Sequence, residues 1–421
     1  MSSSILKELA PEEVRGQAPQ AVLGPALAAA EEIIAQVRRR GREALLEYGR
    51  RFGDLGPAGK LLYTREDLDA ALGRVAPDQR QVLERTADRI GGFAAAQREM
   101  LQDGDVSVQG GRAGWRFFPV GRAGCYAPGG RFPLPSSVLM TAVTARTAGV
   151  KEVWVASPRP VDMTLAAAAV GGADMLVAAG GAQAVAALAY GVEGIPACDV
   201  IVGPGNRFVT AAKQLVTGQV GIDMLAGPSE LVILADASAD PAIIAADLLA
   251  QAEHDPDAVP ILVTTERRLV EEVNRELASQ LEDLPTADIA EYALGNGGVY
   301  TAADLDQAIG ICNTLAPEHL ELMVEDPDQA VDRLDRYGAL FIGAGTAEVL
   351  GDYGAGPNHV LPTGGTARFA GPLSVQDFLV ARSWLRMEPG PGLDALTRDA
   401  AALARVEGLE GHARSAEMRS D

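Results

Sequence analysis

The stretch that decides the fold runs from residue 152 to residue 203 and reads EVWVASPRPVDMTLAAAAVGGADMLVAAGGAQAVAALAYGVEGIPACDVIVG. Its short apolar runs predict strands, and the alanine-rich segments after them predict helices. The expected strands cover residues 152–157, 175–178 and 200–203, and the expected helices cover residues 165–172 and 182–190. A third helix is expected just beyond this stretch, over residues 208–216. This alternation is typical of βαβ units, so we expect a parallel sheet.

A second alternating set follows. It contains the expected strands 231–235, 261–264, 320–324 and 340–342. Asp240 and Pro241 predict a helix start, because Asp is a favoured N-cap and Pro a favoured first helical residue. Two sets with different contents predict two sheet domains.

The flanking regions complete the predicted fold class: α/β, with two Rossmann-like sheet domains of parallel βαβ units and small helical N- and C-terminal extensions. Helices are expected over 20–51 and 77–101, a hairpin or edge strand over 110–120, and a polar helical segment without strands from residue 374. We expect an N-terminal helical extension over 1–21, a discontinuous α/β domain over 22–125 and 231–373 that carries the metal and acid–base residues, an NAD-binding domain over 126–230, and a C-terminal helical segment over 374–421.

Composition limits the partners. The chain holds 36 Lys and Arg against 57 Asp and Glu, a net charge of −21, and so acidic a protein is repelled by nucleic acid and by anionic membranes. We therefore expect a small-molecule substrate, no nucleic acid and no membrane. Three cysteines without CxxC spacing argue against a disulfide framework. The first residues do not resemble a signal peptide, which favours the cytoplasm.

All four histidines lie in short polar motifs, which are QAEHDPD (His254), APEHLEL (His319), GDYGAGPNH (His359) and EGLEGH (His412). Histidine is the side chain most often used both as a metal ligand and as a base near neutral pH. Each one has a carboxylate or amide close by in sequence. The pattern predicts one divalent-metal active site assembled from distant segments.

Two motifs pair a histidine with a second polar group. Gln251 and His254 are three residues apart at the end of an expected helix, so they share a face; taken alone, the polar end of an amphipathic helix explains them better. Glu318 and His319 open an expected strand, where the turn can aim both into one site as two proton-transfer groups. A capped strand entry after Pro317 explains that pair equally well.

The roles of the other polar motifs depend on which residues lie near them in the folded chain. Asp352 lies among glycines in an expected rigid, irregular loop. Alone it is a turn residue, but with Asn358 and His359 it could belong to a loop that carries ligands. Glu407 and His412 are five apart and do not share a helix face, although the glycines near them let the chain bend. Such a tail is usually solvated surface unless it folds onto a site.

Three glycine-rich turns follow expected strands, namely GCYAPGG with Tyr126, GGAQAV with Gln183 and GPGNRFV with Asn206. Backbone N–H groups in such turns, and helix N-termini, favour phosphate groups. None is a complete GxGxxG motif. The nearest, GAGTAE at residues 343–348, has Glu348 in place of the third glycine. We discount it, because a carboxylate there repels a pyrophosphate.

In order along the chain, the motifs GCYAPGG, PSSVLM, GGAQA, GPGN, AGPSE, QAEH, APEHLEL, GDYGAGPNHVLPTGG and EGLEGH resemble the histidinol dehydrogenase family. The resemblance covers nearly the whole chain. The only mild departure is Ala127-Pro128, which affects no ligand. Related enzymes that oxidise other alcohols depart after NHVLPT, whereas this chain keeps NHVLPTGGTARF, which favours histidinol.

The resemblance implies a role for each motif. One Zn²⁺ per subunit would be held by Gln251, His254, Asp352 and His412, an N/O set that also tolerates manganese or cobalt. Glu318 and His319 would be the acid–base pair. NAD would be bound by Tyr126, Gln183 and Asn206. The substrate would contact Ser229, Glu407, Gln251, His254, His319, Asp352 and His412. The C-terminal segment would cross to the partner of a homodimer with shared active sites.

The implied reaction is the four-electron oxidation of L-histidinol to L-histidine through L-histidinaldehyde with two NAD, the last step of histidine biosynthesis. His319 would take the hydroxyl proton and Glu318 would activate water. Three alternatives stay open. They are a thiohemiacetal on Cys125, a metal-binding protein without catalysis, and an alcohol dehydrogenase for another substrate.

Overall fold

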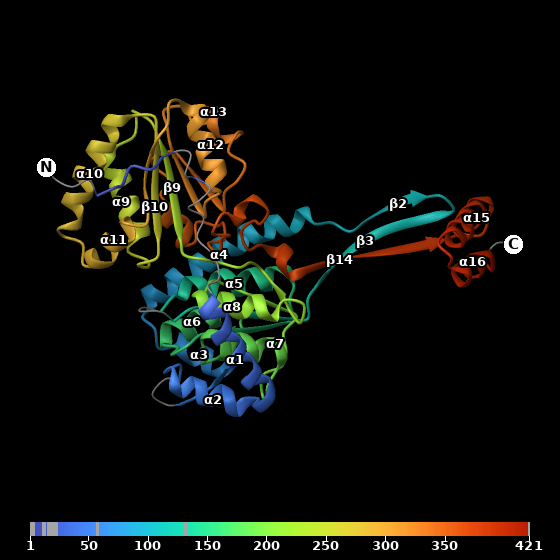
Figure 1. The fold of residues 1–421 in the computed structure, drawn as a ribbon. Coiled ribbons are helices and arrows are strands. Elements are labelled where there is room, and N and C mark those ends of the chain that lie inside the picture. The colour runs from blue at the N-terminus through green and yellow to red at the C-terminus, as the bar shows by residue number, and fades with distance from the viewer. Residues whose placement is uncertain (1–4, 11–13, 15–23, 56–58, 130–132, 420–421) are drawn as a thin grey trace.

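The computed structural model describes residues 5–10, 14, 24–55, 59–129 and 133–419. Two lobes lie against each other, and an arm projects from their junction (Figure 1). Each lobe is built on its own sheet with helices on both faces, and the arm ends in a pair of helices. The predicted α/β class with two mainly parallel sheets is confirmed.

The first lobe holds a six-stranded sheet in the order β1-β6-β5-β4-β7-β8, parallel except for β1. Its strands are β1 (Leu62–Thr64), β4 (Arg122–Tyr126), β5 (Glu152–Ala156), β6 (Met175–Val177), β7 (Val200–Val202) and β8 (Gly221–Ile222). Its helices are α1 (Gly24–Arg40), α2 (Arg42–Arg51), α3 (Arg65–Leu72), α4 (Pro77–Met100), α5 (Pro135–Ala148), α6 (Asp162–Val170), α7 (Gly181–Tyr190) and α8 (Arg207–Val216). The strands and helices expected over residues 152–216 are confirmed to within a few residues.

The domain boundary expected at residue 125 is wrong. The strands β1 and β4 pair within the first sheet, and α1 packs on α7 and α8 while α3 packs on α6. The small side chains of α6 and α7 are almost all buried, which lets these neighbours approach closely. Residues 24–126 therefore belong mostly to the first lobe, apart from β2 and β3 in the arm, and not with residues 231–373.

The second lobe holds a five-stranded, wholly parallel sheet in the order β11-β10-β9-β12-β13. Its strands are β9 (Glu230–Ala235), β10 (Val259–Thr264), β11 (Gly298–Thr301), β12 (His319–Met323) and β13 (Ala339–Ile342). Its helices are α9 (Pro241–Ala252), α10 (Arg267–Leu281), α11 (Ala287–Leu294), α12 (Leu305–Leu315), α13 (Asp328–Val331) and α14 (Glu348–Asp352). The 3-10 helices η2 (Thr366–Arg368) and η3 (Val375–Phe378) follow, and η3 packs against α4 and α5 of the first lobe. Among the described elements no helix is both long and apolar enough to cross a membrane.

The predicted cap of α9 is confirmed, because the Asp240 side chain accepts a hydrogen bond from the backbone N–H of Ala242 at 2.9 Å. We expect Asp240→Ala to lower the free energy of unfolding by about 1 kcal/mol, the usual effect of losing an N-cap. Urea denaturation measures this, with Glu271→Ala on the exposed face of α10 as the control. Equal stability of the two variants would contradict the capping role.

The arm differs from the purely helical C-terminal segment that was expected from residue 374. Its three-stranded antiparallel sheet has the order β14-β3-β2, formed by β2 (Gly104–Val108), β3 (Gly111–Pro119) and β14 (Leu379–Met387). The helices α15 (Pro391–Val406) and α16 (Glu410–Glu417) follow. The region after residue 374 thus contains a long strand that was not expected. Residues 110–120, expected to form a hairpin or an edge strand, hold the single strand β3, which forms a hairpin with the preceding β2 and is the central strand of the sheet, not an edge.

The part of the N-terminal extension that the structure describes is not the helix that was expected. Leu9 donates its N–H to the carbonyl of Val299, and Val299 donates to the carbonyl of Lys7, so this stretch is an extended addition beside β11 and not a helix. Residues 1–4, 11–13 and 15–23, which were also expected to be helical or to begin a helix, lie outside the described residues.

Candidate active site

A group of buried acids and histidines lies at the amino ends of β9 and β12. Glu230 and His319 are the first residues of these neighbouring strands, and Ser229 and Glu318 directly precede them. His319 is paired with Leu231, one residue beyond Glu230, so the two strand starts lie side by side. The register therefore gathers four polar residues at one edge of the second sheet.

Glu318 and His319 point into the same site, as the sequence analysis expected. The Nδ1 of His319 lies 3.7 Å from Oε2 of Glu318 and 3.0 Å from the carbonyl oxygen of Glu230. That carbonyl only accepts hydrogen bonds, so Nδ1 carries the proton and Nε2 keeps its lone pair. The Nε2 atom is buried and has no hydrogen-bond partner among the described residues. His319 is thus presented as a base through Nε2.

Burial sets the protonation of this pair. Desolvation lowers the pKa of His319 to about 4, so the imidazole is neutral at pH 7. Desolvation raises the pKa of Glu318 well above its ordinary value, although the backbone N–H of Glu230 donates to this carboxylate at 2.9 Å and Ser229 also favours the charged form. Burial thus favours the neutral form of both groups.

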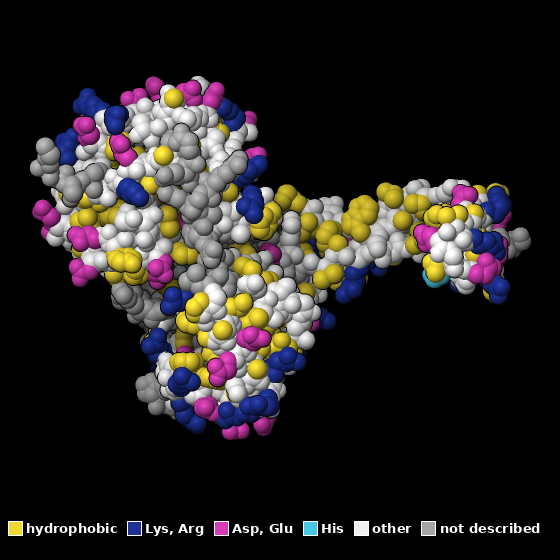
Figure 2. Space-filling model, viewed as in Figure 1, with side chains coloured by type: hydrophobic (Ala, Val, Ile, Leu, Met, Phe, Trp, Pro, Cys, Tyr) yellow, Lys and Arg dark blue, Asp and Glu magenta, His cyan; other side chains and the backbone are white. Residues whose placement is uncertain are grey.

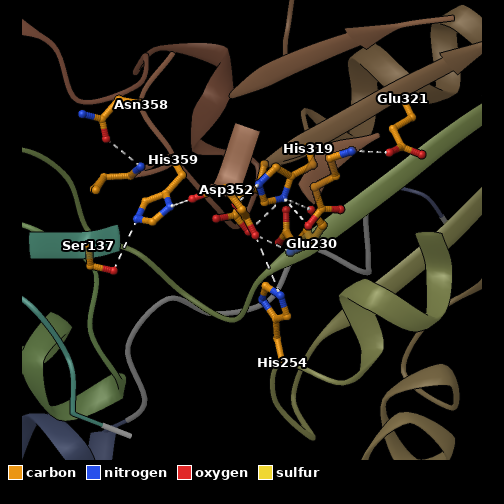
Figure 3. A network of polar contacts seen from close by, with 11 residues as sticks. Ser137, Glu230, His254, His319, Glu321, Asp352, Asn358 and His359 are labelled. Carbon is orange, nitrogen blue, oxygen red and sulfur yellow. Dashed lines mark hydrogen bonds and ion pairs between the residues drawn. The ribbon is translucent and has the colours of Figure 1, made fainter. Parts of the chain in front are cut away.

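Two of the four expected metal ligands, His254 and Asp352, lie close to each other here (Figure 3). Gln251 lies in the last turn of α9 and His254 lies just beyond it. The Nε2 of His254 is 3.8 Å from Oδ2 of Asp352, and the Nε2 of His319 is 3.9 Å from Oδ1 of the same carboxylate. Asp352 ends the short helix α14, so the irregular loop expected around it begins one residue later.

The donor atoms fit a divalent cation. Ligand atoms of His254, Glu348 and Asp352 all lie within 4.8 Å of one another. Both amide atoms of Gln251 and both carboxylate oxygens of Glu348 are buried and have no partner among the described residues. Buried polar atoms are normally paired, and a cation would satisfy the oxygens. Oxygen and imidazole nitrogen donors together suit zinc or a similar ion.

Glu348 is the site residue that the sequence analysis missed. It begins α14, is almost fully buried, and lies four residues before Asp352, so both side chains share one helix face. Its carboxylate lies 3.8 Å from Nδ1 of His319. Burial and the negative charge of Asp352 raise its pKa well above its ordinary value. The i,i+4 spacing from Asp352 was the signal available, but it was read only as a failed dinucleotide motif.

His359 connects the two lobes and is not aimed at the other ligands. Its Nδ1 lies 2.9 Å from the carbonyl oxygen of Asp352, and its Nε2 lies 3.3 Å from the hydroxyl of Ser137 at the start of α5. The neighbouring Asn358 donates to the carbonyl of Met140. Both ring nitrogens of His359 are therefore occupied, and the loop expected to carry ligands instead fixes α14 against the first lobe.

Glu407 and His412 are not part of this group within one chain. Glu407 caps the end of α15, and His412 is an exposed residue of α16, at the far end of the arm (Figure 1). The arm also carries exposed apolar side chains, including Leu385 at 63% and Val406 at 84% exposure. Figure 2 shows hydrophobic side chains along the length of the arm.

The residues expected to bind a dinucleotide lie at the carboxyl edge of the first sheet. Tyr126 ends β4, Gln183 lies in the first turn of α7 after β6, and Asn206 precedes α8 after β7. The chain runs from β4 outward through β5 and β6, then returns to β7 on the other side of β4. Ligands of open parallel sheets bind outside the carboxyl ends of strands at such a switch point.

The turn that holds Asn206 is rigidly supported. The buried Lys213 donates to the carbonyl of Gly203 and forms an ion pair with Asp223, which accepts from the N–H of Gly203. Gly203 has a φ of 116°, and a Cβ there would meet the Tyr126 carbonyl. The Oδ1 of Asn206 caps α8 by accepting from the N–H groups of Phe208 and Val209, so its amide nitrogen takes no part in the cap.

Two lobes on parallel sheets, with buried acids and histidines beside their junction, define a two-domain α/β enzyme. Comparison with known proteins gives its family. The family model described as histidinol dehydrogenase matches residues 19–420. The chain belongs to the histidinol dehydrogenase family, whose members are oxidoreductases.

Individual relatives agree with this membership. The chain is 46% identical over 398 residues to a histidinol dehydrogenase of Pseudomonas savastanoi pv. phaseolicola, covering 92% of this chain and 88% of the relative. It is 48% identical over 393 residues to one of Thermus thermophilus, covering 92% and 93%. The crystal structure of histidinol dehydrogenase from Elizabethkingia anophelis is similar with a TM-score of 0.92 and 30% identity, covering 100% of this chain and 99% of that one.

Proposed function

We propose that this protein oxidises L-histidinol to L-histidine through L-histidinaldehyde, with two NAD and one zinc ion per subunit. The family match over residues 19–420 carries this proposal. The geometry of the second lobe supports it, because the buried Glu318–His319 pair lies beside Asp352, which in turn lies beside the exposed His254. Zinc would supply a cationic anchor for the imidazole and amine of the substrate, and NAD would accept hydride.

The first oxidation needs a base for the hydroxyl proton of histidinol. The Nε2 of His319 is suited to this, since it is neutral, unpartnered and 3.9 Å from the Asp352 carboxylate. His319 would hold this proton at Nε2 while the carbinol hydrogen leaves as hydride. The Glu230 carbonyl would keep the other ring nitrogen protonated and stabilise the imidazolium.

The second oxidation needs a base for water. Glu318 would take a proton from the water that adds to the aldehyde carbon, and the resulting hydrate would then lose hydride to yield the carboxylate. Burial raises the pKa of Glu318, so its carboxylate forms at a higher pH than that of an exposed glutamate, and Glu318 would act as a base in this carboxylate form.

We further propose a homodimer in which α16 of each subunit reaches the site of the other. Within one chain His412 and Glu407 lie on the arm, away from the residues that they are expected to join. The exposed apolar side chains of the arm suit burial against a second copy. His412 would then be the fourth zinc ligand and Glu407 a substrate contact, supplied across the interface.

The direct test is absorbance at 340 nm with histidinol and NAD, with and without a chelator. We expect NADH to form at two equivalents per histidinol and to stop after the metal is removed. A metal-dependent turnover of a plain or sulfonated amino alcohol, with none of histidinol, would instead support an alcohol dehydrogenase for another substrate. Metal binding without any turnover would support a non-catalytic protein.

A cysteine nucleophile is the rival mechanism for the second oxidation. Cys125 lies fully buried in β4, and burial raises the pKa of its thiol to about 12, so the nucleophilic thiolate is not formed at neutral pH. We expect Cys125→Ser to keep full activity in steady-state NADH formation. Loss of aldehyde oxidation in a folded Cys125→Ser protein would favour the thiohemiacetal route.

A further inference from the structure

Asp54 is a buried acid that the reaction described above does not use. It follows α2 and is only 6% exposed. Its Oδ2 accepts two hydrogen bonds, from the Gln183 amide nitrogen at 2.7 Å and from the backbone N–H of Gly180 at 3.0 Å. Asp54 therefore touches the turn between β6 and α7 that carries one of the expected dinucleotide contacts.

A carboxylate accepts hydrogen bonds but does not donate them, so Asp54 determines which way the Gln183 amide faces. The Nε2 of Gln183 must point to Asp54, and Oε1 must point away from it. Within the described part of the chain, Oε1 accepts no hydrogen bond. A Cβ on Gly181 would come within 3.0 Å of this oxygen, so the glycine leaves room beside it.

Tyr126 complements this arrangement. Its hydroxyl oxygen accepts from the backbone N–H of Gly181 at 3.1 Å, so the phenolic hydrogen is left to donate. Burial raises the pKa of Tyr126 to about 12, so the phenol keeps that hydrogen at neutral pH. An acceptor from Gln183 and a donor from Tyr126 thus both lie beside Gly181.

We propose that Asp54 is a positioning residue of the dinucleotide site, which locks Gln183 so that its Oε1 accepts a hydrogen bond from an O–H or N–H group of the bound dinucleotide. The inference rests on the proposed use of NAD. Two parts of NAD carry such donors, the adenosine and ribose groups and the nicotinamide carboxamide. A purely structural Asp54, holding only the N–H of Gly180, would not affect ligand binding through Gln183.

The test is a double-mutant cycle on the full-length, zinc-loaded protein, read by calorimetric binding of NAD and of ADP-ribose, which lacks the carboxamide. We expect Asp54→Ala to weaken NAD binding by about tenfold. We expect no further weakening by Asp54→Ala in a Gln183→Ala background, since its effect passes through that side chain. Asp54→Asn keeps an acceptor oxygen and should stay within about threefold of wild type.

The outcomes separate the two proposals. Unchanged NAD binding in Asp54→Ala, or an equal loss in the Gln183→Ala background, overturns the role of Asp54 while leaving NAD use intact. Failure of the wild type to bind either probe overturns NAD use and this inference with it. A loss with both probes supports the inference with a donor on the ADP-ribose part, and a loss with NAD alone supports it with the carboxamide.

Asp54→Glu provides a second test in case Asp54→Ala fails to fold. Asp54→Glu keeps the negative charge beside the N–H of Gly180 but moves its oxygens by one methylene group. It should also weaken NAD binding, while zinc content stays at the wild-type level because Asp54 lies in the first lobe. Wild-type NAD affinity in this variant would likewise contradict the positioning role.

Discussion

Glu318→Gln is expected to slow the oxidation of histidinaldehyde by about 10²–10⁴-fold, the usual contribution of a placed proton-transfer group. The oxidation of histidinol should slow far less, because His319 is the base in that step. Glutamine keeps an oxygen to accept from the N–H of Glu230, so the strand start should be preserved. Single-turnover measurements with each substrate separate the two half-reactions.

The pH dependence of aldehyde oxidation gives a second test of Glu318→Gln. Burial raises the pKa of Glu318, so its carboxylate form increases as the pH rises, and the wild-type rate of aldehyde oxidation should rise with it. Glu318→Gln should lose this rise. The control is Glu325→Gln, an exposed side chain just after β12. Equal losses in both half-reactions would contradict the assigned division of labour.

His412→Asn is expected to lower zinc affinity by at least about 100-fold, since even residues that only orient metal ligands contribute 10–100-fold. The reason is that α16 is proposed to supply the fourth ligand to a partner's site. Zinc content measured after equilibration in metal buffers gives the affinity. NAD binding, which depends on the first lobe, should be unchanged.

The matched control is Asp399→Asn, an exposed side chain on α15 of the same helical pair. If His412 were only solvated surface, as its exposure within one chain would otherwise imply, the two variants would bind zinc equally. That result would remove the C-terminal segment from the site and leave three ligands from one chain.

Short-range sequence patterns predicted the helices and strands whose formation depends on residues close together in the chain. The helix over 77–101 and the strands over 152–203 show clear periodicity, and the structure places α4, β5, β6 and β7 there. The strand β14 was missed because its stability comes from pairing with β3, more than 250 residues earlier in the chain. The domain boundary failed for the same reason, since β1 pairs with β6, which lies more than 110 residues later in the chain.

The site was predictable in part. Distant motifs suggested that His254, Asp352 and the Glu318–His319 pair converge, and the strand register and helix ends bring them together. Glu348 was missed because GAGTAE was considered only as an incomplete dinucleotide motif, and the burial of Glu348 depends on tertiary packing. No sequence pattern indicated Asp54, since its contact with Gln183 spans 129 residues.

We propose that one active site is built from the end of α9, from α14 and from the start of β12 of one chain, and from α16 of another. Co-expression of a His254→Asn chain and a His412→Asn chain with different tags tests it, after isolation of the mixed dimers. One of the two sites in each mixed dimer would then contain only wild-type residues, so we predict roughly half of the wild-type histidinol oxidation, whereas each variant alone is inactive. Mixed dimers as inactive as their parents would contradict the shared site.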